Sequence, residues 1–277
     1  MTALVERTRC PSCEGGATST LYSRPYAHPS VWPRVSQRYP GRLHRRALSG
    51  RRYEIASCDH CRLLFQRFVP CAASLRRLYG EWLPDPSEFG GSKAPPLLAR
   101  PLPGRILDFG AGDGRFCRAA HASGLEVVAI DIAEPRLSPL RTLGIEAHTS
   151  VDELTKANFG LIRCHRILEH LPHPFETLHK LTDRLAPGGR LELCVPDAVR
   201  WARGVRRGFW DAASSPLRPL EQLNGFSSRA VEVLARRLDL VAWEQAPTPW
   251  NGREHDGLLF RALERRPHDD ADRRRAA

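Results

Sequence analysis

The stretch ILDFGAGDGRF, residues 106–116, joins an apolar strand to a helix through a loop with glycine at three alternate positions, Gly110, Gly112 and Gly114. A strand, a glycine loop and a helix in this order are typical of the first unit of an open α/β sheet, in which ligands bind at the carboxyl ends of the strands. The spacing G-x-G-x-G differs from the G-x-G-x-x-G that places a pyrophosphate on a helix end. We therefore expect a ligand other than a dinucleotide to approach the bare backbone of this loop.

Acidic side chains stand at the ends of the first two strands. Asp131 ends the apolar run 125–131, 17 residues after Gly114, where a carboxylate can accept hydrogen bonds from two ribose hydroxyls. Asp108 adds a carboxylate at the end of the first strand. Negative charge at this place is unfavourable for a diphosphate and favourable for the ammonium and sulfonium groups of an amino-acid nucleoside.

From residue 105 onward, short apolar strands alternate with helical patterns of about ten residues. This alternation predicts a parallel sheet with helices on both faces, followed by a helix at 227–238, a strand at 239–246 and a last strand at 256–264.

Three stretches of the sequence, in this order, resemble motifs of the class I S-adenosylmethionine-dependent methyltransferases. LDFGAGDGRF resembles the glycine motif of that family, VVAIDIA its ribose-binding acidic residue, and RILEHLPHPFETLHKLTDRLAPGGRLELCVPD the stretch from its fourth strand to its fifth. The paired cysteines, followed by CRLLFQRFVP, resemble the zinc ribbon of one bacterial branch, which is associated with modifying saccharides and secondary metabolites. The resemblance implies a Rossmann-like, doubly wound, seven-stranded and mostly parallel sheet with S-adenosylmethionine as cofactor. It implies cofactor contacts from Asp108, Gly110, Ala111, Gly112, Gly114, Asp131 and Ile132.

Two departures from the family pattern concern the fourth strand. Family members usually carry Phe-Asp before that strand, where this chain has Phe159 and Gly160. Some relatives bind a divalent metal through Glu-x-x-Glu-His, but Arg166 stands at the first of these positions and cannot ligate a cation. We therefore interpret Glu169 and His170 as neighbours of the active site and not as a metal site.

The candidate catalytic residues are His170, Glu169 and His165. His170 is the best candidate for a general base, whereas Glu169 is either a substrate-binding carboxylate or a carboxylate that favours a helix start. His165, at the end of the fourth strand, and Asp197, after the fifth, either border the pocket or are loop residues without a role. Because the sulfonium is already an activated leaving group, a base is needed only if the nucleophile must lose a proton.

Four of the eight cysteines form two C-x-x-C pairs, Cys10 with Cys13 and Cys58 with Cys61. Two such turns supply four thiolates, the ligand set of a closed structural zinc site, although 44 residues separate the pairs and free thiols in a small subdomain are the alternative. The remaining cysteines, Cys71, Cys117, Cys164 and Cys194, have no paired spacing. The last three lie in apolar patterns typical of core residues.

Positive charge is concentrated in the first part of the chain. Residues 1–105 contain 17 basic and 7 acidic side chains, and the rest of the chain contains 25 and 24. Because arginine outnumbers lysine by 39 to 3, codon bias accounts for the excess as well as phosphate contacts would, and we favour a solvated basic face over a nucleic-acid footprint. No apolar run approaches a membrane span or a signal peptide, so we expect a cytoplasmic location without membrane contact.

We expect four regions: a zinc-ribbon-like subdomain with a basic insertion (22–52) at 1–70, a helix and linker at 71–104, the methyltransferase domain at 105–264, and a disordered tail at 265–277. Substrate selection is expected from 71–100 and from the insertion 198–226, in which Trp201, Phe209 and Trp210 stand among arginines. The latter insertion is alternatively an amphipathic helix over the sheet edge.

The favoured function is methyl transfer to a small-molecule acceptor. The alternatives are an RNA base or ribose methyltransferase and a non-catalytic zinc-ribbon protein with a degenerate fold. Against RNA base methylation, this chain lacks the Asn/Asp-Pro-Pro-aromatic motif after the fourth strand. Against the non-catalytic protein, the glycines and Asp131 are intact.

Overall fold

The computed structural model of the chain describes residues 3–83, 104–155, 158–207, 217–241, 244–250 and 253–265. The expected linker up to residue 103, the aromatic residues Phe209 and Trp210, and the expected tail from residue 266 lie outside the described residues.

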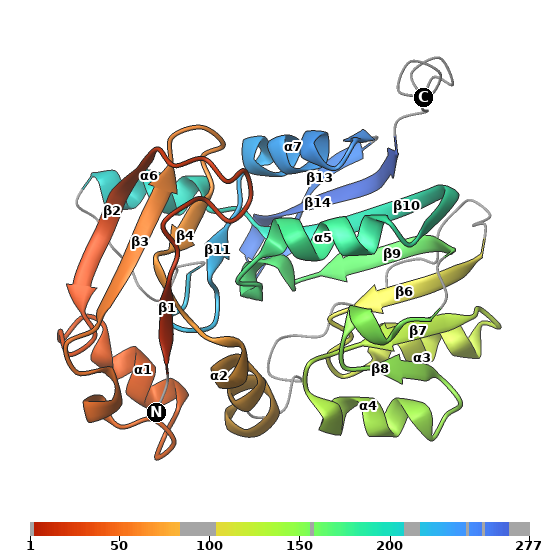
Figure 1. The fold of residues 1–277 in the computed structure, drawn as a ribbon, viewed down its shortest axis with the longest axis horizontal. Coiled ribbons are helices and arrows are strands. Elements are labelled where there is room, and N and C mark those ends of the chain that lie inside the picture. The colour runs from red at the N-terminus through yellow and green to blue at the C-terminus, as the bar shows by residue number, and fades with distance from the viewer. Residues whose placement is uncertain are drawn as a thin grey trace, which may run out of the picture.

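The larger sheet has eight strands in the order β12-β14-β10-β9-β6-β7-β8, with β13 paired to β14 (Figure 1). Its parallel part comprises β8 (Glu146–His148), β7 (Val127–Ile130), β6 (Arg105–Phe109), β9 (Phe159–His165) and β10 (Leu185–Pro196). Antiparallel to β10 runs β14 (Arg253–Arg265), and it also pairs with β12 (Leu240–Val241) and β13 (Glu244–Trp250). The predicted Rossmann-like fold is confirmed, and the strand expected at 239–246 is divided into β12 and β13.

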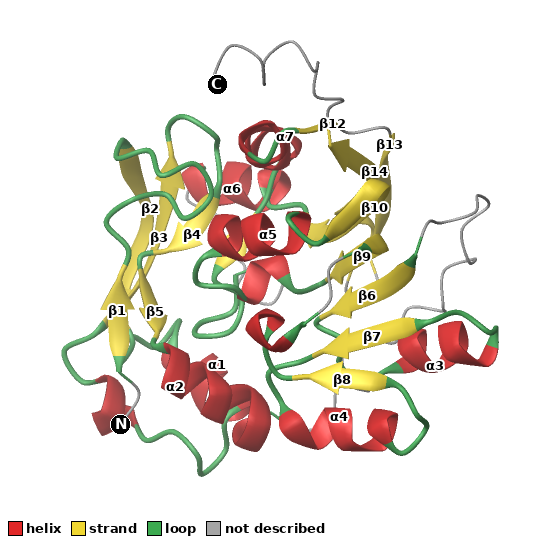
Figure 2. Ribbon diagram, turned by 45° about the vertical axis from the view of Figure 1, so that its right-hand side comes forward, coloured by secondary structure: helices red, strands yellow, loops and turns green. Residues whose placement is uncertain are grey.

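Helices cover both faces of this sheet because neighbouring strand residues point to opposite sides. Ile106 packs in a core with residues of α3 (Arg115–Ala122) and α4 (Glu134–Arg141). Leu107 packs in a different core, with residues of α5 (Pro174–Thr182) and α7 (Ser228–Arg237). Figure 2 shows the sheet between α5 and α7 on one side and α3 on the other. The strand order reverses at β6, which lies between β7 and β9, so the carboxyl end of β6 is the switch point at which such folds bind ligands.

Residues 3–83, which we call the N-terminal module, form two small sheets. One pairs β1 (Leu4–Glu6) with β5 (Phe68–Pro70), and the other contains β2 (Thr18–Pro25), β3 (Arg52–Cys58) and β4 (Leu64–Gln66). The fourth strand of the second sheet is β11 (Asn224–Gly225), which comes from the other end of the chain and pairs with β4 (Figure 1). The module is therefore completed by a segment that follows the parallel strands.

The basic insertion, residues 22–52, packs in a hydrophobic core that is separate from the two cores of the large sheet. It contains α1 (Trp32–Arg38) and η1 (Arg45–Leu48), and its buried side chains include Tyr26, Val35 and Tyr39. They share this core with Trp201 of α6 (Val199–Arg206) and with Leu217. The insertions 22–52 and 198–226 thus pack together.

The paired cysteines share a core with the large sheet. Cys58 and Cys61 belong to one buried cluster with Leu107 of β6 and Leu234 of α7. The N-terminal module ends with α2 (Ala72–Arg77) and a π-helical turn, η2 (Leu78–Trp82), where a helix was expected. Within the described part of the chain, every helix is too short or too polar to cross a bilayer.

Candidate functional site

A cavity of about 530 Å³ lies at the carboxyl ends of β6, β7 and β9. Two parts of its wall are distinguished below. The glycine side consists of Gly110, Ala111, Gly112, Asp131 and Ile132. The histidine side consists of Leu75, Tyr79, Glu169, His170 and Gln222.

Backbone amides hold the Asp131 carboxylate at the end of β7. Gly112 N–H donates to Oδ2 and Ala133 N–H donates to Oδ1, each at 2.9 Å, and Arg136 Nη1 lies 3.5 Å from Oδ1. Burial raises the pKa of Asp131, whereas Arg136 and the two amides act in the opposite direction. The carboxylate is fixed in orientation and keeps acceptor capacity for hydroxyl groups in the cavity.

The backbone at Gly112 faces open cavity. Its φ of +58° lies in the left-handed region that favours glycine, and the nearest atom to a Cβ built there would be Gly110 O at 4.0 Å. A flat ligand can therefore lie directly on this part of the loop.

Two residues expected to contact a cofactor are not part of the cavity wall among the described residues. Asp108 is 2% exposed, and its Oδ1 accepts a hydrogen bond from Arg163 Nη1 at 3.0 Å. Gly114 lies against α4, where a Cβ would come within 2.4 Å of Leu140 Cδ2. Asp108 therefore neutralises a buried arginine, and Gly114 allows α3 and α4 to pack closely. Neither residue lines the described cavity, and a cofactor contact of either stays a prediction.

Glu169 is the least solvated acidic group of the cavity wall. It lies in η5 (Leu168–His170) and is 0% exposed, and neither of its carboxylate oxygens has a hydrogen-bond partner within the described residues. Burial raises the pKa of Glu169 to about 8. A buried carboxyl without a partner that faces a cavity is a candidate for binding or proton transfer.

His170 lies beside Glu169, with Nε2 3.5 Å from Glu169 Oε1. Its Nδ1 is 2.7 Å from the Tyr79 hydroxyl and 3.0 Å from the carbonyl oxygen of Glu221. Burial lowers the pKa of His170 to about 4, so the ring is neutral near pH 7. With Nδ1 occupied, Nε2 is the nitrogen that faces Glu169.

His165 also lines the cavity, but contacts occupy both of its ring nitrogens. Arg163 Nη2 is 2.7 Å from Nδ1, and Glu192 Oε1 is 2.5 Å from Nε2. Burial lowers the pKa of His165. Since an arginine can only donate, Nδ1 accepts and Nε2 carries the proton. His165 is consequently less available as a base than His170. Asp197 accepts from Val199 N–H at 2.9 Å at the start of α6 and is not part of the described cavity wall.

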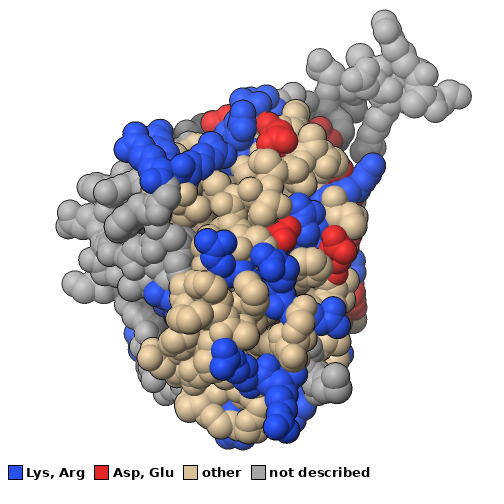
Figure 3. Space-filling model, turned by 90° about the vertical axis from the view of Figure 1, so that its left-hand side faces the viewer, with Lys and Arg blue, Asp and Glu red and all other residues tan. Residues whose placement is uncertain are grey.

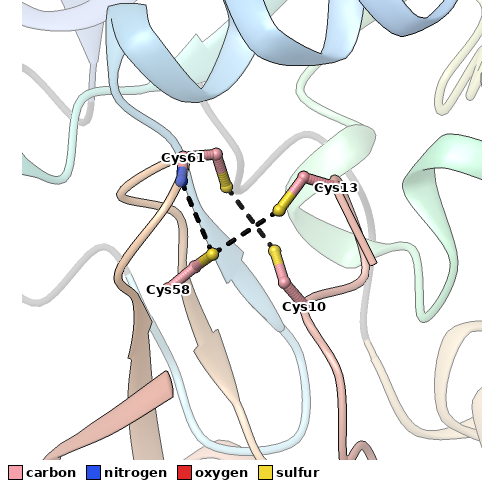
Figure 4. A group of neighbouring side chains, drawn as sticks. All are labelled: Cys10, Cys13, Cys58 and Cys61. Carbon is pink, nitrogen blue, oxygen red and sulfur yellow. Dashed lines mark hydrogen bonds between the residues drawn. The ribbon is translucent and has the colours of Figure 1, made fainter. Parts of the chain in front are cut away.

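The four paired cysteines converge from two turns, with their sulfurs pointing toward one another (Figure 4). Their Sγ atoms all lie within 4.8 Å of one another, and the Cys10–Cys61 and Cys13–Cys58 pairs are 3.5 Å apart. Four thiolates at this spacing fit a closed tetrahedral zinc site that serves structure and not chemistry. Arg237 and Arg229 of the α7 helix donate to the carbonyl oxygens of Ser12 and His60 at 2.7 and 3.0 Å, which ties both turns to that helix.

Several residues of the cavity wall were missed from the sequence. Tyr79 follows Leu75 at helical spacing, so the sequence does place the two on one helix face. Arg218 and Gln222 come from the insertion 198–226, part of which therefore reaches the cavity, whereas Trp201 is buried in the module core. Only the tertiary fold brings the insertion to this wall.

Comparison with known proteins gives the family. A family model described as a methyltransferase domain matches residues 75–245. Ubiquinone biosynthesis O-methyltransferases of Xylella fastidiosa and Hahella chejuensis are 35% identical over 102 residues and 36% identical over 101 residues, respectively. These matches cover 33% and 32% of this chain and 42% of each relative, so the chain spans about two fifths of the length of these curated relatives.

Among solved structures, a 1,6-didemethyltoxoflavin-N1-methyltransferase of Burkholderia thailandensis is 22% identical, with a TM-score of 0.46, over 60% of this chain and 72% of that one. Because the family model covers more than half of the chain, the chain belongs to the methyltransferase-domain family.

Proposed function

We propose that the chain transfers the methyl group of S-adenosylmethionine to a small polar acceptor, such as a saccharide or a secondary metabolite, that binds on the histidine side. One observation carries the proposal. The buried, unpartnered Glu169 carboxyl and the neutral His170 ring face the same cavity as the open backbone of Gly112 and the fixed Asp131 carboxylate.

The glycine side is proposed to hold the cofactor. Asp131 accepts from the ribose hydroxyls, while Gly110, Ala111 and Gly112 allow close approach to their backbone, and Ile132 covers the adenosine. The bound sulfonium supplies an activated methyl group. The protein then has to hold the acceptor in line with that group and to exclude water.

Proton removal is proposed for His170. Its Nε2, which lies 3.5 Å from Glu169 Oε1, accepts the proton of an acceptor hydroxyl. Tyr79 and the Glu221 carbonyl fix the ring through Nδ1. A base that is neutral at pH 7 can accept a proton without a metal ion, and Arg166 replaces the first metal ligand of some relatives.

The proposed acceptor carries hydroxyl groups. Tyr79 and Gln222 present hydrogen-bond donors and acceptors on the histidine side, with Leu75 as an apolar wall. The similarity to O-methyltransferases supports transfer to oxygen, although it covers only part of those relatives.

Calorimetry with S-adenosylmethionine and S-adenosylhomocysteine tests the cofactor assignment. We expect both to bind, and their failure to bind to folded protein would refute the proposal. Mass spectrometry of a panel of saccharides and phenols incubated with the cofactor then tests the acceptor. His170→Asn should keep cofactor affinity and lose transfer, whereas the exposed His173→Asn should keep both.

Methylation of RNA is the second candidate, because the N-terminal module is basic. Figure 3 shows Lys and Arg scattered among uncharged atoms over this side of the molecule. The exposed arginines of the insertion are spread over β2, η1, the start of β3 and the loops between them: Arg24, Arg42, Arg45, Arg46, Arg51 and Arg52. RNA binding through them should weaken by about one decade of affinity per decade of salt for each phosphate neutralised. Filter binding to total cellular RNA at two salt concentrations distinguishes the two functions. Tight, steeply salt-dependent retention would overturn the small-molecule proposal.

A further inference from the structure

Arg7, the residue after β1, is a buried cation whose five N–H groups all donate to carbonyl oxygens. It is 5% exposed. Nε and Nη2 donate to Gln66 O at 2.9 and 2.6 Å, and Nη2 also donates to Leu223 O at 2.8 Å. Nη1 donates to Pro172 O at 3.1 Å and to Asn224 Oδ1 at 2.8 Å. Burial lowers the pKa of Arg7 to about 9, which reflects the cost of desolvating the cation.

Asn224, in β11, continues this network toward the cavity. Its side chain is fully buried, and Nδ2 donates to Leu168 O at 2.9 Å and to Leu171 O at 2.7 Å. Since Oδ1 accepts from Arg7, every polar group of the amide is used. The neighbouring Leu223 N–H donates to Glu169 O at 2.5 Å.

These contacts engage four of the five carbonyl groups from 168 to 172, those of Leu168, Glu169, Leu171 and Pro172. This short loop contains η5, and the carbonyl groups at the end of so short a helix have few partners within it. A cation and an amide donor at that end satisfy the carbonyls and suit the negative end of the helix dipole.

We propose that Arg7 and Asn224 are positioning residues, which fix the 168–172 loop so that Glu169 and His170 face the methyl acceptor. The inference rests on the proposed function of those two side chains. It assigns the N-terminal module a part in the reaction, because Arg7 reaches the loop across the boundary between the module and the large sheet. A shift of the reacting groups by 1 Å can cost about 100-fold in rate, so a buried cation is an effective means of control.

Asn224→Asp is the sharpest variant. The near-isosteric carboxylate keeps the acceptor for Arg7 and loses both donors to Leu168 and Leu171. Arg7→Lys is the second variant, since a lysine keeps the charge but cannot make five hydrogen bonds to these four acceptors. The matched control is Arg67→Gln in the same module, which breaks the 2.6 Å contact of Arg67 with Glu54 and touches no residue of the loop. Retention of zinc and of near-ultraviolet circular dichroism identifies folded variants.

Amide hydrogen exchange, cofactor affinity and turnover are then measured. We expect the amides of His170, Leu171 and Leu223 to exchange at least about tenfold faster in Asn224→Asp and Arg7→Lys, with β2 and β3 unchanged. The Kd of S-adenosylhomocysteine should stay within about twofold, and kcat for an acceptor identified with the wild type should fall by about 100-fold. The control should match the wild type in all three.

Unchanged loop exchange in both folded variants would overturn the positioning role, as would exchange that accelerates equally throughout the N-terminal module. Failure of the wild type to bind either cofactor form would instead refute the proposed function, while the exchange comparison would still decide whether Arg7 and Asn224 hold the loop.

Discussion

The glycine side of the cavity comes from one continuous part of the chain, the β6–loop–α3 unit and the end of the next strand, β7. The histidine side is assembled from residues 75–79, 169–170 and 218–222, and from Arg7 behind them. Local hydrogen bonds fix the first, such as Gly112 N–H to Asp131 at 2.9 Å. Contacts between distant segments fix the second, such as Tyr79 to His170 at 2.7 Å. Cofactor binding can thus persist in variants in which the histidine side is disrupted.

Removal of zinc should have the largest effect, and the effect should extend beyond the N-terminal module. The cysteine turns share a core with Leu234 of α7 and are hydrogen-bonded to that helix, so metal loss should expose α7 and β11 as well as the module. Structural zinc sites contribute about 10 kcal/mol or more of folding free energy in small domains. We expect chelation, or Cys58→Ser, to abolish exchange protection in α7, whereas Cys71→Ser should not. Protected α7 in metal-free protein would show that the two parts fold independently.

Glu169→Gln should change the pH dependence of stability. Burial raises the pKa of the folded-state carboxyl from 4.5 to about 8. The folded state therefore favours the protonated form, and its stabilisation is full below pH 4.5 and is lost as the pH rises through 8. The glutamine variant should avoid that loss. At pH 9 its free energy of unfolding should exceed that of the wild type by on the order of 3 to 5 kcal/mol.

Urea unfolding at pH 5, 7 and 9 measures this difference. Glu176→Gln, at an exposed glutamate of the same cavity wall, is the control and should follow the wild type. Parallel pH curves for wild type and Glu169→Gln would mean that Glu169 does not carry a raised pKa.

Asp131→Ala should weaken binding on the glycine side and leave the histidine side intact. Loss of the carboxylate removes hydrogen bonds to the ribose, and charged hydrogen bonds contribute about 2 kcal/mol, so the Kd of S-adenosylhomocysteine should rise about 30-fold. Exchange of the 168–172 loop should not change. The control Asp152→Ala removes an exposed carboxylate of the same cavity, and equal weakening by both variants would contradict the role given to Asp131.

Tyr79→Phe should have the smallest effect. It removes the hydroxyl that contacts His170 Nδ1 and donates to Glu221 O at 3.2 Å, and should reduce the free energy of unfolding by about 1 kcal/mol. Tyr26→Phe is a matched control, because the buried Tyr26 hydroxyl has no hydrogen-bond partner within the described residues. Its removal should be neutral or stabilising, and equal losses for both variants would argue against a specific Tyr79–His170 bond.

The same contrast explains what the sequence could predict. Alternating strands and helices, the glycine spacing and Asp131 lie close together in the chain, so the fold and most of the glycine side followed from pattern and resemblance. The contact of Asp108 with Arg163 could not be predicted, because Arg163 comes from another strand of the sheet. Arg7, Tyr79 and Asn224 belong to separate segments with ordinary local patterns, and no spacing along the chain indicates that all three contact the 168–172 loop.

The pairing of β11 with β4 has a consequence for the order of folding. Phe65 of β4 pairs with Asn224 and Leu64 pairs with Gly225, so the module's sheet keeps an open edge until the ribosome has released residue 225. Contacts between residues so far apart in sequence slow folding, and an unpaired edge strand is a template for association with other chains. Early capture of zinc by the cysteine turns would hold the module compact during this interval. A strand of two residues thus makes complete folding of the first quarter of the chain depend on a segment from the last quarter.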